Sequence, residues 1–359
     1  MKTVFNKDNQ GHLTKNYPIF FGDSLGLLDT VNVTNKRIEA LKEQQRSNAW
    51  YPTEVSMTQD RQDMINVNRD TADLMVLTIS WQHLTDSITG RSIGAMLLPH
   101  VTNPEAEVMI SEWSNIEFVH GEAYSHIVKQ TMSDPDQSLL DTYRDLKILA
   151  RSKNIIKVFD DLYTMPLDLP LREKKKIMAK ALCVINVMEL CSFMASFCVT
   201  FAIAETGVFQ GIAETVSLIA KDELLHGHMS YELIKATRDV DGWEDIYEEI
   251  KPEVQEIIKS IVQGELDWNA YLFSEGRKVV GLTEDLLDDT VLYFANTVYK
   301  ILKLDNPFKV VENNPSKFME HYLDRSLLQF APQEIQHGSY RQGAVVDDLG
   351  GDLDLDFDV

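Results

Sequence analysis

Apolar residues recur at spacings of three and four along most of the chain, which is the pattern of helices that bury one face. Runs that alternate apolar and polar residues, as strands do, are scarce. At Asn103-Pro104, the asparagine can cap a helix and the proline can occupy its first position. Long helices are predicted over residues 71–89, 104–132, 137–163, 171–206 and 212–237, with two or three more between 243 and 304. The pattern predicts an all-α protein.

Three segments differ in composition. Residues 1–30 hold few periodic apolar positions, and we expect them to lie on the surface. No linker rich in Pro or Gly interrupts residues 31–335, so they are predicted to form one helical domain. Residues 336–359 are rich in Asp, contain one basic residue, and are predicted to be disordered. Four apolar residues alternate with the last aspartates: Leu353, Leu355, Phe357 and Val359. They favour docking of this tail into a groove of a partner, with a purely solvated tail as the alternative.

One predicted helix is apolar enough to be mistaken for a membrane span. Residues 181–204 have roughly the length that crosses a bilayer. Asn186 and Glu189 lie inside this stretch, and a carboxylate is costly in hydrocarbon. We therefore expect a central helix of a soluble bundle and no membrane association. Glu189 then becomes a buried carboxylate that needs a partner.

Charge and cysteine content narrow the classes of function. The 359 residues include 34 Lys and Arg and 56 Asp and Glu, which gives a net charge of −22. Such acidity argues against binding nucleic acid or an anionic membrane. Three cysteines are too few for a disulfide framework, and residues 1–13 lack the apolar core of a signal peptide. We expect a cytoplasmic protein whose cysteines pack in the core.

Two Glu-x-x-His pairs lie on predicted long helices. They are Glu117 with His120 and Glu223 with His226, and residues three apart share a helix face. Such a pair offers a metal ion one oxygen and one nitrogen ligand. A third pair, Glu334 with His337, lies near the chain end and is interpreted as coincidence.

Each of the two helices follows another that carries an acid in an apolar stretch. Asp86 lies 31 residues before Glu117, and Glu189 lies 34 residues before Glu223. Four such helices build a dinuclear carboxylate site in the core of a ferritin-like bundle. Four carboxylates and two divalent ions sum to zero charge, which offsets the cost of burial. Oxygen ligands with one imidazole per metal suit iron or manganese. The alternative, two buried ion pairs, lacks Arg or Lys at matching positions.

A tyrosine stands beside these candidate ligands. Tyr124 follows His120 by four residues and Glu117 by seven, so it shares their helix face. Three apolar residues stand at helical spacing from the other acids: Phe193, Phe197 and Ile219. An oxidising metal centre can oxidise a phenol, and apolar surroundings would protect the radical. Asp222 could accept the second ring N–H of a ligating histidine, either His120 or His226.

These motifs carry a resemblance to a known family. The matching segments are Asp86-Ser-Ile-Thr-Gly90-Arg91-Ser92, Glu117-x-x-His120-x-x-x-Tyr124 and Lys221-Asp222-Glu223-x-x-His226. They resemble the small, radical-generating (β) subunit of class I ribonucleotide reductase, over about residues 45–359. The resemblance implies an all-α ferritin-like homodimer that holds two iron ions, oxo-bridged when oxidised, or manganese in their place. The implied metal ligands are Asp86, Glu117, His120, Glu189, Glu223 and His226.

The resemblance also implies a reaction and a partner. O2 is activated at the metals, and Tyr124 becomes a stable radical inside the pocket of Phe193, Phe197 and Ile219. The radical equivalent then passes to the large catalytic (α) subunit, which reduces ribonucleoside diphosphates to deoxyribonucleotides. The residues implied in transfer and subunit communication are Trp50, Asp222 and Tyr340, and Glu54 and Glu334. The C-terminal tail is implied to dock on the α subunit.

Two other functions are compatible with a dinuclear site. One is a self-contained di-iron oxidase or hydroxylase, which needs a substrate channel and no radical tyrosine. The other is a ferritin-like iron-binding protein, which needs no docking tail. Tyr124 and the tail that carries Tyr340 favour the reductase subunit. The sequence does not indicate whether the protein is encoded by a cell or by a virus, in which case the cytoplasm would be that of the host.

Overall fold

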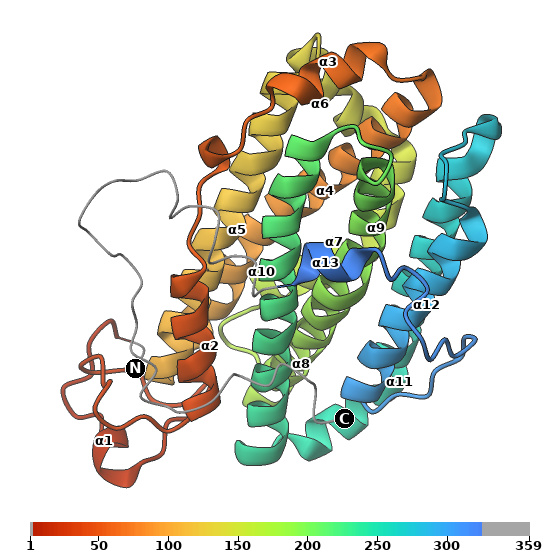
Figure 1. Cartoon of the computed structure of the whole chain (residues 1–359). Helices are drawn as coiled ribbons and strands as arrows, with labels where there is room; N and C mark the ends of the chain where they lie inside the picture. The colour runs from red at the N-terminus through yellow and green to blue at the C-terminus, as the bar shows by residue number, and fades with distance from the viewer. Residues whose placement is uncertain (1–2, 325–359) are drawn as a thin grey trace, which may run out of the picture.

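The computed structural model describes residues 3–324, which fold into a bundle of long helices that run alongside one another (Figure 1). Four helical runs form its centre: α4 (Arg69–Leu97), α5 (Pro104–Thr131), the run from α8 (Leu171–Val187) to α9 (Phe193–Ala204), and α10 (Gln210–Lys235). The surrounding helices are α2 (Lys36–Ser47), α3 (Thr58–Asn66), α6 (Pro135–Arg144), α7 (Leu146–Tyr163), α11 (Glu244–Phe273) and α12 (Glu284–Ile301), with short α1 (Gly11–Thr14) and α13 (Met319–Leu323). Within the described residues, β-structure is limited to two isolated bridges. The predicted all-α ferritin-like fold is confirmed.

The outer helices enclose the four central helical runs on several sides. Helix α2 packs on α5 and α10, while α7 packs on α4, α8 and α11. Helices α11 and α12 cover the α8–α9 side. The centre of the bundle is therefore enclosed by protein on several sides, which makes it a low-dielectric environment for any polar group inside.

The sequence placed some helix ends correctly and others wrongly. Helix α5 begins as predicted, because the Asn103 side chain accepts the N–H of Ala106 and Pro104 follows it. The single helix predicted over 137–163 is wrong: it is divided at Asp145, whose carboxylate caps α7. The predicted end at Gly90 is also wrong, since α4 continues to Leu97. A Cβ at Gly90 would lie 3.4 Å from the Glu117 carbonyl oxygen, an ordinary contact distance, so this residue lies where α4 packs against α5.

The helix predicted over 171–206 is continuous but changes its winding. Residues Met188–Ser192 form one π-helical turn, η3, in which the N–H of Phe193 donates to the Met188 carbonyl. Such single wide turns inside α-helices are frequent at functional sites. The most apolar 18-residue window of the whole run is completely buried. This burial agrees with the prediction of a core helix in a soluble bundle.

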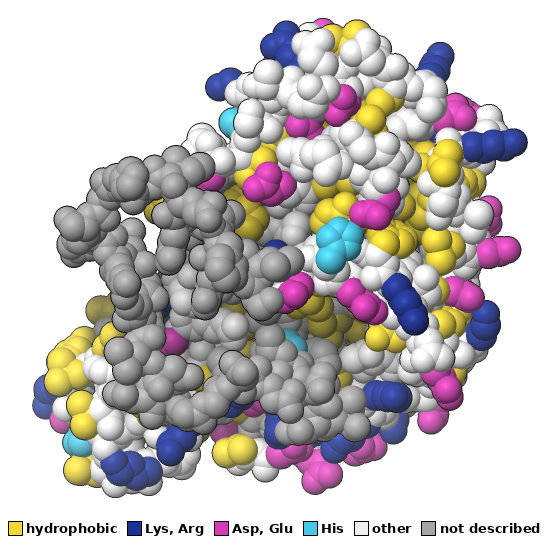
Figure 2. Space-filling view, in the orientation of Figure 1, with side chains coloured by type: hydrophobic (Ala, Val, Ile, Leu, Met, Phe, Trp, Pro, Cys, Tyr) yellow, Lys and Arg dark blue, Asp and Glu magenta, His cyan; other side chains and the backbone are white. Residues whose placement is uncertain are grey.

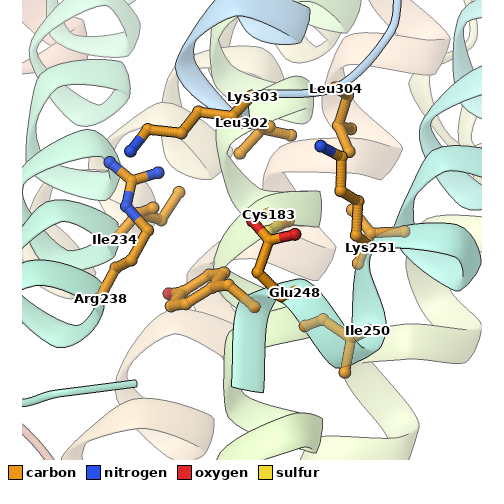
Figure 3. A pocket seen from close by; sticks show the side chains of 11 residues that line it. Cys183, Ile234, Arg238, Glu248, Ile250, Lys251, Leu302, Lys303 and Leu304 are labelled. Atoms are coloured by element: carbon orange, nitrogen blue, oxygen red, sulfur yellow. The ribbon is translucent and has the colours of Figure 1, made fainter. Parts of the chain in front are cut away.

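The three cysteines are free and buried, as the core-packing interpretation requires. Cys183 lines a cavity of about 20 Å³ together with Glu248, Arg238 and Lys303 (Figure 3). That volume has room for roughly one water molecule. Burial raises the pKa of the Cys183 thiol to about 12, so the thiol stays protonated and unreactive.

The N-terminal segment is mostly exposed but anchored by several hydrogen bonds around residues 17–22. Ile19 and Phe20 are buried, and the Ile19 N–H donates to the Asp241 carboxylate at 2.7 Å. Acidic and basic side chains are interspersed over the face drawn in Figure 2, with small apolar patches between them. The domain limits at residues 30 and 335 stay predictions.

Candidate metal centre

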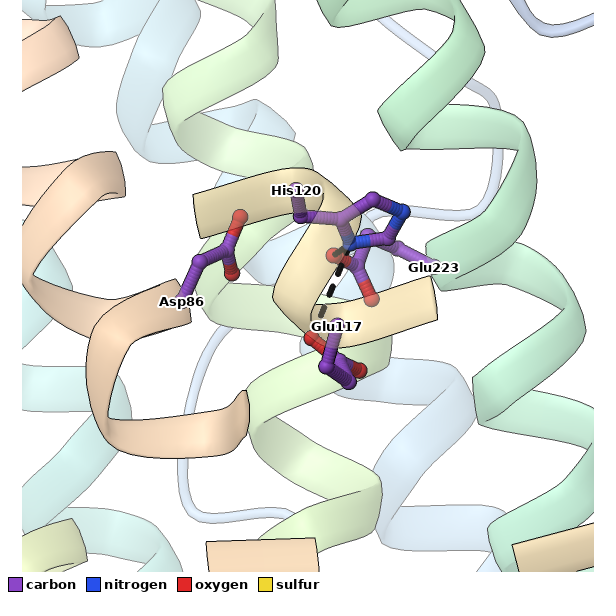
Figure 4. Close-up of side chains that lie close together, drawn as sticks. All are labelled: Asp86, Glu117, His120 and Glu223. Carbon is purple, nitrogen blue, oxygen red and sulfur yellow. Dashed lines mark ion pairs between the residues drawn. The ribbon is translucent and has the colours of Figure 1, made fainter. Parts of the chain in front are cut away.

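The bundle core brings together the six residues proposed from the sequence as metal ligands. Helix α4 supplies Asp86, α5 supplies Glu117 and His120, η3 supplies Glu189, and α10 supplies Glu223 and His226. Their ligand atoms form two overlapping groups, and within each group these atoms lie within 4.8 Å of one another. One group is Asp86, Glu117, His120 and Glu223 (Figure 4), and the other is Glu117, Glu189, Glu223 and His226. Glu117 and Glu223 belong to both groups, so they lie between two potential ion positions.

Close contacts join the two Glu-x-x-His helices. Nδ1 of His120 lies 3.1 Å from a Glu223 carboxylate oxygen and 3.6 Å from one of Glu117. Nδ1 of His226 lies 2.9 Å from an oxygen of each of the same two glutamates. The imidazoles therefore face the shared carboxylates from opposite helices, as the helical spacing of each pair predicts.

The polar atoms of this cluster fit a pair of cations. Both carboxylate oxygens of Asp86 and both of Glu189 are buried without a hydrogen-bond partner among the described residues. Within residues 3–324, no Lys or Arg forms an ion pair with any of the four acids. Burial, reinforced by Glu223, raises the pKa of Asp86 and of Glu189. Two divalent ions would supply the missing positive charge and the missing partners, so these residues fit a dinuclear metal centre.

Asp222 lies behind His120 and not behind His226. One of its oxygens, Oδ2, lies 3.2 Å from Nε2 of His120 and accepts the Trp50 indole N–H at 2.8 Å. The other oxygen accepts the side-chain N–H of Gln45 at 3.0 Å. The Trp50 and His120 rings stack with centroids 6.0 Å apart. Asp222 thus ties a candidate ligand to a tryptophan that is 5% exposed. Gln45 was not singled out from the sequence, which predicted no helix over α2; the available signal was its spacing of seven and four residues from Ile38 and Leu41 on the buried face of that helix.

Trp113 is a second residue that the sequence reasoning missed. Its indole N–H donates to Glu117 at 2.8 Å, and its ring stacks on that of His226 with centroids 5.2 Å apart. The signal was present, because Trp113 precedes Glu117 by four residues and therefore shares its helix face.

Tyr124 is completely buried on α5. Its hydroxyl has no hydrogen-bond partner among the described residues. Burial, followed by the charge of Asp86, raises the pKa of Tyr124 well above its usual value, so the phenol is protonated. Phe193 and Phe197 are also fully buried and stack with centroids 5.8 Å apart. Ile219 is buried on α10, and the joint contact of these three with Tyr124 stays a prediction.

The remaining predicted residues fall into two groups. Glu54 is exposed at the end of the short helix η1 (Pro52–Glu54), a few residues from Trp50. Glu334, Tyr340 and the tail 336–359 lie outside the described residues.

A cavity of about 340 Å³ lies beside the cluster, and both buried ligands and exposed side chains line it. Asp86 and Glu117 contribute to its inner wall, and Phe118 and Tyr143 to its outer rim. Phe118 is 55% exposed and Tyr143 69% exposed, and the exposed side chains of Arg91 and Glu122 also line the cavity, so the rim combines aromatic and charged groups.

The family profile described as "Ribonucleotide reductase, small chain" matches residues 28–315. The chain belongs to the ribonucleotide reductase small-chain family. The ribonucleoside-diphosphate reductase 1 subunit beta of Escherichia coli O157:H7 is 30% identical, and the match covers 98% of this chain and 97% of that protein. The subunit beta of Enterobacteria phage T4 is 27% identical, with 99% of each chain covered.

Solved structures of the family share the fold. The ribonucleotide reductase R2 subunit from Clostridium botulinum superposes with a TM-score of 0.80 at 17% identity and covers 90% of this chain and 98% of its own. The dimanganese(II)-NrdF of Streptococcus sanguinis gives a TM-score of 0.67 at 17% identity and covers 85% of this chain and 100% of its own. Both likenesses support the ferritin-like architecture. Membership of the family confirms the resemblance that the motifs indicated.

Proposed function

We propose that this chain is the β subunit of a class I ribonucleoside-diphosphate reductase, and that it stores an oxidising equivalent as a neutral radical on Tyr124. The convergence of four carboxylates, two imidazoles and a buried phenol in one bundle core carries this proposal. The names of the curated relatives and the match to the family support it. The large subunit would use the radical to reduce ribonucleotides to deoxyribonucleotides.

The proposed metal ligands are the six core residues. Asp86 and His120 would hold one ion, Glu189 and His226 the other, and Glu117 and Glu223 would lie between them. A bound pair of iron ions supplies the one-electron oxidising power of O2 chemistry, and manganese is the alternative. The donor set suits both metals. The dimanganese form of the Streptococcus sanguinis relative supports keeping manganese as a candidate.

The protein's own residues determine which group is oxidised. The buried phenol of Tyr124 is protonated, so loss of an electron must be accompanied by loss of the hydroxyl proton. Asp86 is the carboxylate that acts most strongly on this phenol. Phe193, Phe197 and Ile219 are proposed to surround Tyr124 and would exclude water from its phenol. These features would prolong the life of the radical.

Asp222 is proposed to connect the metal centre with the protein surface. It accepts the Trp50 N–H and contacts His120, so it links the indole to a metal ligand. Gln45 would hold its carboxylate in this orientation. Transfer is proposed to continue through Tyr340, with Glu54 and Glu334 in subunit communication and the tail 336–359 docking on the large subunit. A cytoplasmic location follows from this partnership.

A homodimer is proposed through the face of α5 and α6. Phe118, Leu139 and Tyr143 line one cavity on this face, and all three are exposed. Clusters of exposed apolar residues commonly mark protein interfaces. Sedimentation of the wild type should give a dimer, and Phe118→Glu with Tyr143→Glu should give a monomer. A wild-type monomer would contradict this proposal.

Activity with the large subunit tests the proposed function. The metal-loaded wild type, mixed with a large subunit from the same source, should produce deoxyribonucleotides. Tyr124→Phe should bind two metal ions but give no product. A chain ending at residue 335 should form the radical but lose activity, because it cannot dock. Full activity of Tyr124→Phe would contradict storage of the oxidising equivalent on Tyr124. Consumption of O2 by the wild type without formation of deoxyribonucleotides would favour a self-contained oxidase.

A further inference from the structure

A buried arginine lies flat against a tryptophan beside the candidate metal centre. The guanidinium carbon of Arg151, on α7, is 3.4 Å from the centre of the Trp81 ring, on α4. Trp81 is 0% exposed, and its ring centroid is 5.5 Å from that of Phe193. Phe193 directly follows the π-helical turn that carries Glu189, and Asp86 lies about 7.5 Å further along the α4 axis from Trp81. An indole this close to an oxidising centre could give up an electron in place of Tyr124.

The position of Arg151 is held by several polar contacts. Its Nε donates to the Glu265 carboxylate at 2.9 Å, and its Nη2 contacts the same oxygen. Nη2 also donates to the Ser196 hydroxyl at 2.9 Å and to the Ser192 carbonyl at 3.3 Å. The ring of Trp268 lies 4.9 Å from the guanidinium carbon. Contacts from α9, α11 and the π-helical turn therefore keep the cation on the indole face.

The three tryptophans near the centre differ in what they contact. Trp50 and Trp113 each donate the indole N–H to a carboxylate at 2.8 Å. The N–H of Trp81 has no partner among the described residues, and a cation covers its ring. A one-electron oxidised indole is positively charged and readily releases its N–H proton. Nearby carboxylates favour both changes for Trp50 and Trp113.

We infer that Arg151 protects Trp81 from one-electron oxidation, so that the oxidising equivalent reaches Tyr124. This inference rests on the proposed function. A neutral indole attracts the guanidinium through its negative ring face. Removal of an electron converts this attraction into repulsion between two positive charges in a medium of low dielectric constant. The Trp81 proton also lacks an acceptor. Arg151 touches no reacting atom, so it acts on selectivity and not on the chemical step.

The inference can be tested on the metal-free protein with azide radicals generated by pulse radiolysis. Each azide radical takes one electron from an indole and becomes azide, and the oxidised indole releases a proton. Superoxide and a proton then convert the indolyl radical into a hydroperoxide, which peptide mass spectrometry locates. Trp113 is the matched comparison, because it is also 0% exposed, its N–H has a carboxylate acceptor, and the His226 ring that stacks on it lies 2.9 Å from two carboxylates, which offset any charge on the imidazole. A cation–π contact in a desolvated site stabilises the neutral indole. It should lower the equilibrium constant for one-electron oxidation of that indole roughly thirtyfold.

In the wild type, we expect the oxidised fraction of Trp81 to be at least about tenfold below that of Trp113. The paired variant Arg151→Gln with Glu265→Gln removes both charges and avoids an unpaired buried carboxylate. It should raise oxidation of Trp81 about tenfold or more and leave Trp113 unchanged. Arg151→Lys keeps the charge and should keep most of the protection.

Equal oxidation of Trp81 and Trp113 in the wild type would overturn the inference, whether or not the paired variant folds. A folded paired variant with unchanged oxidation of Trp81 would also overturn it. The assay uses no metal, so its result is independent of radical formation at Tyr124. Failure of the proposed function would instead appear as the absence of a tyrosyl radical in the metal-loaded protein.

Discussion

Replacement of Glu189 should weaken metal binding and at the same time stabilise the metal-free protein, so the two effects can be measured separately. Its side chain is 0% exposed, and both oxygens lack a hydrogen-bond partner among the described residues. A buried acceptor without a partner costs about 1–3 kcal/mol, and an apolar side chain of similar shape avoids that cost. Glu189→Met should therefore stabilise the metal-free protein by about 2 kcal/mol.

That free energy corresponds to a small but measurable shift of the melting temperature. The entropy of unfolding is about 2.1 cal/mol/K per residue, or about 0.75 kcal/mol/K for a chain of 359 residues. Glu189→Met should therefore raise the Tm of the metal-free protein by about 3 °C. Differential scanning calorimetry measures this shift.

The same substitution should remove one of the two ion positions. The group of Asp86, Glu117, His120 and Glu223 stays intact, so a titration with Co(II) should give one ion per chain in place of two. Glu214→Met, at an exposed position of α10, is the control and should keep both ions. Two tightly bound ions in Glu189→Met, or a fall in the Tm of its metal-free form, would refute the reasoning.

Three further predictions concern other parts of the molecule. Asp222→Asn weakens the link to His120 and should lower activity with the large subunit about 10–100-fold while two metal ions still bind, as activity assays and metal analysis would show. Burial raises the pKa of Asp241 to about 6, so the free energy of unfolding should fall as the pH rises from about 4 through 6. Urea unfolding at several pH values would show this fall, and Asp241→Asn should make it smaller. A Cβ at Gly227 would lie 2.1 Å from a Leu190 methyl carbon, so Gly227→Ala should lower the Tm; Gly264→Ala, which meets no atom within 4 Å, should stabilise by about 0.5–1 kcal/mol.

The candidate ligands could be predicted because helical periodicity alone determines which residues share a face. The two residues of each Glu-x-x-His pair are three positions apart. In a long helix this spacing places both side chains on the same face. The acids of the other two helices were recognisable because carboxylates are rare in apolar stretches. The choice of His120 as the partner of Asp222 depends on how α5 and α10 pack, and spacing along the chain does not contain that information.

Other features depend on contacts between residues far apart in the sequence. Arg151 and Glu265 are separated by 114 residues, and each looks like an ordinary charged residue of an amphipathic helix. The π-helical turn at Glu189 leaves the apolar pattern of its helix almost unchanged, so periodicity does not reveal it. Gly90 resembles a helix end in sequence, whereas it lies inside α4, where this helix packs against the backbone of α5.

Electron paramagnetic resonance of the reconstituted protein tests the central claim most directly. The metal-free chain is loaded with Fe(II), exposed to O2 and frozen, and the same is done with Tyr124→Phe. The account predicts a tyrosyl signal in the wild type that is absent from Tyr124→Phe, while both proteins bind two ions. A tyrosyl signal that persists in Tyr124→Phe would contradict the assignment of the radical. The proposed function would be contradicted if the iron-loaded wild type consumed O2 but formed no radical, and if the manganese-loaded wild type also formed none after an oxidant was added.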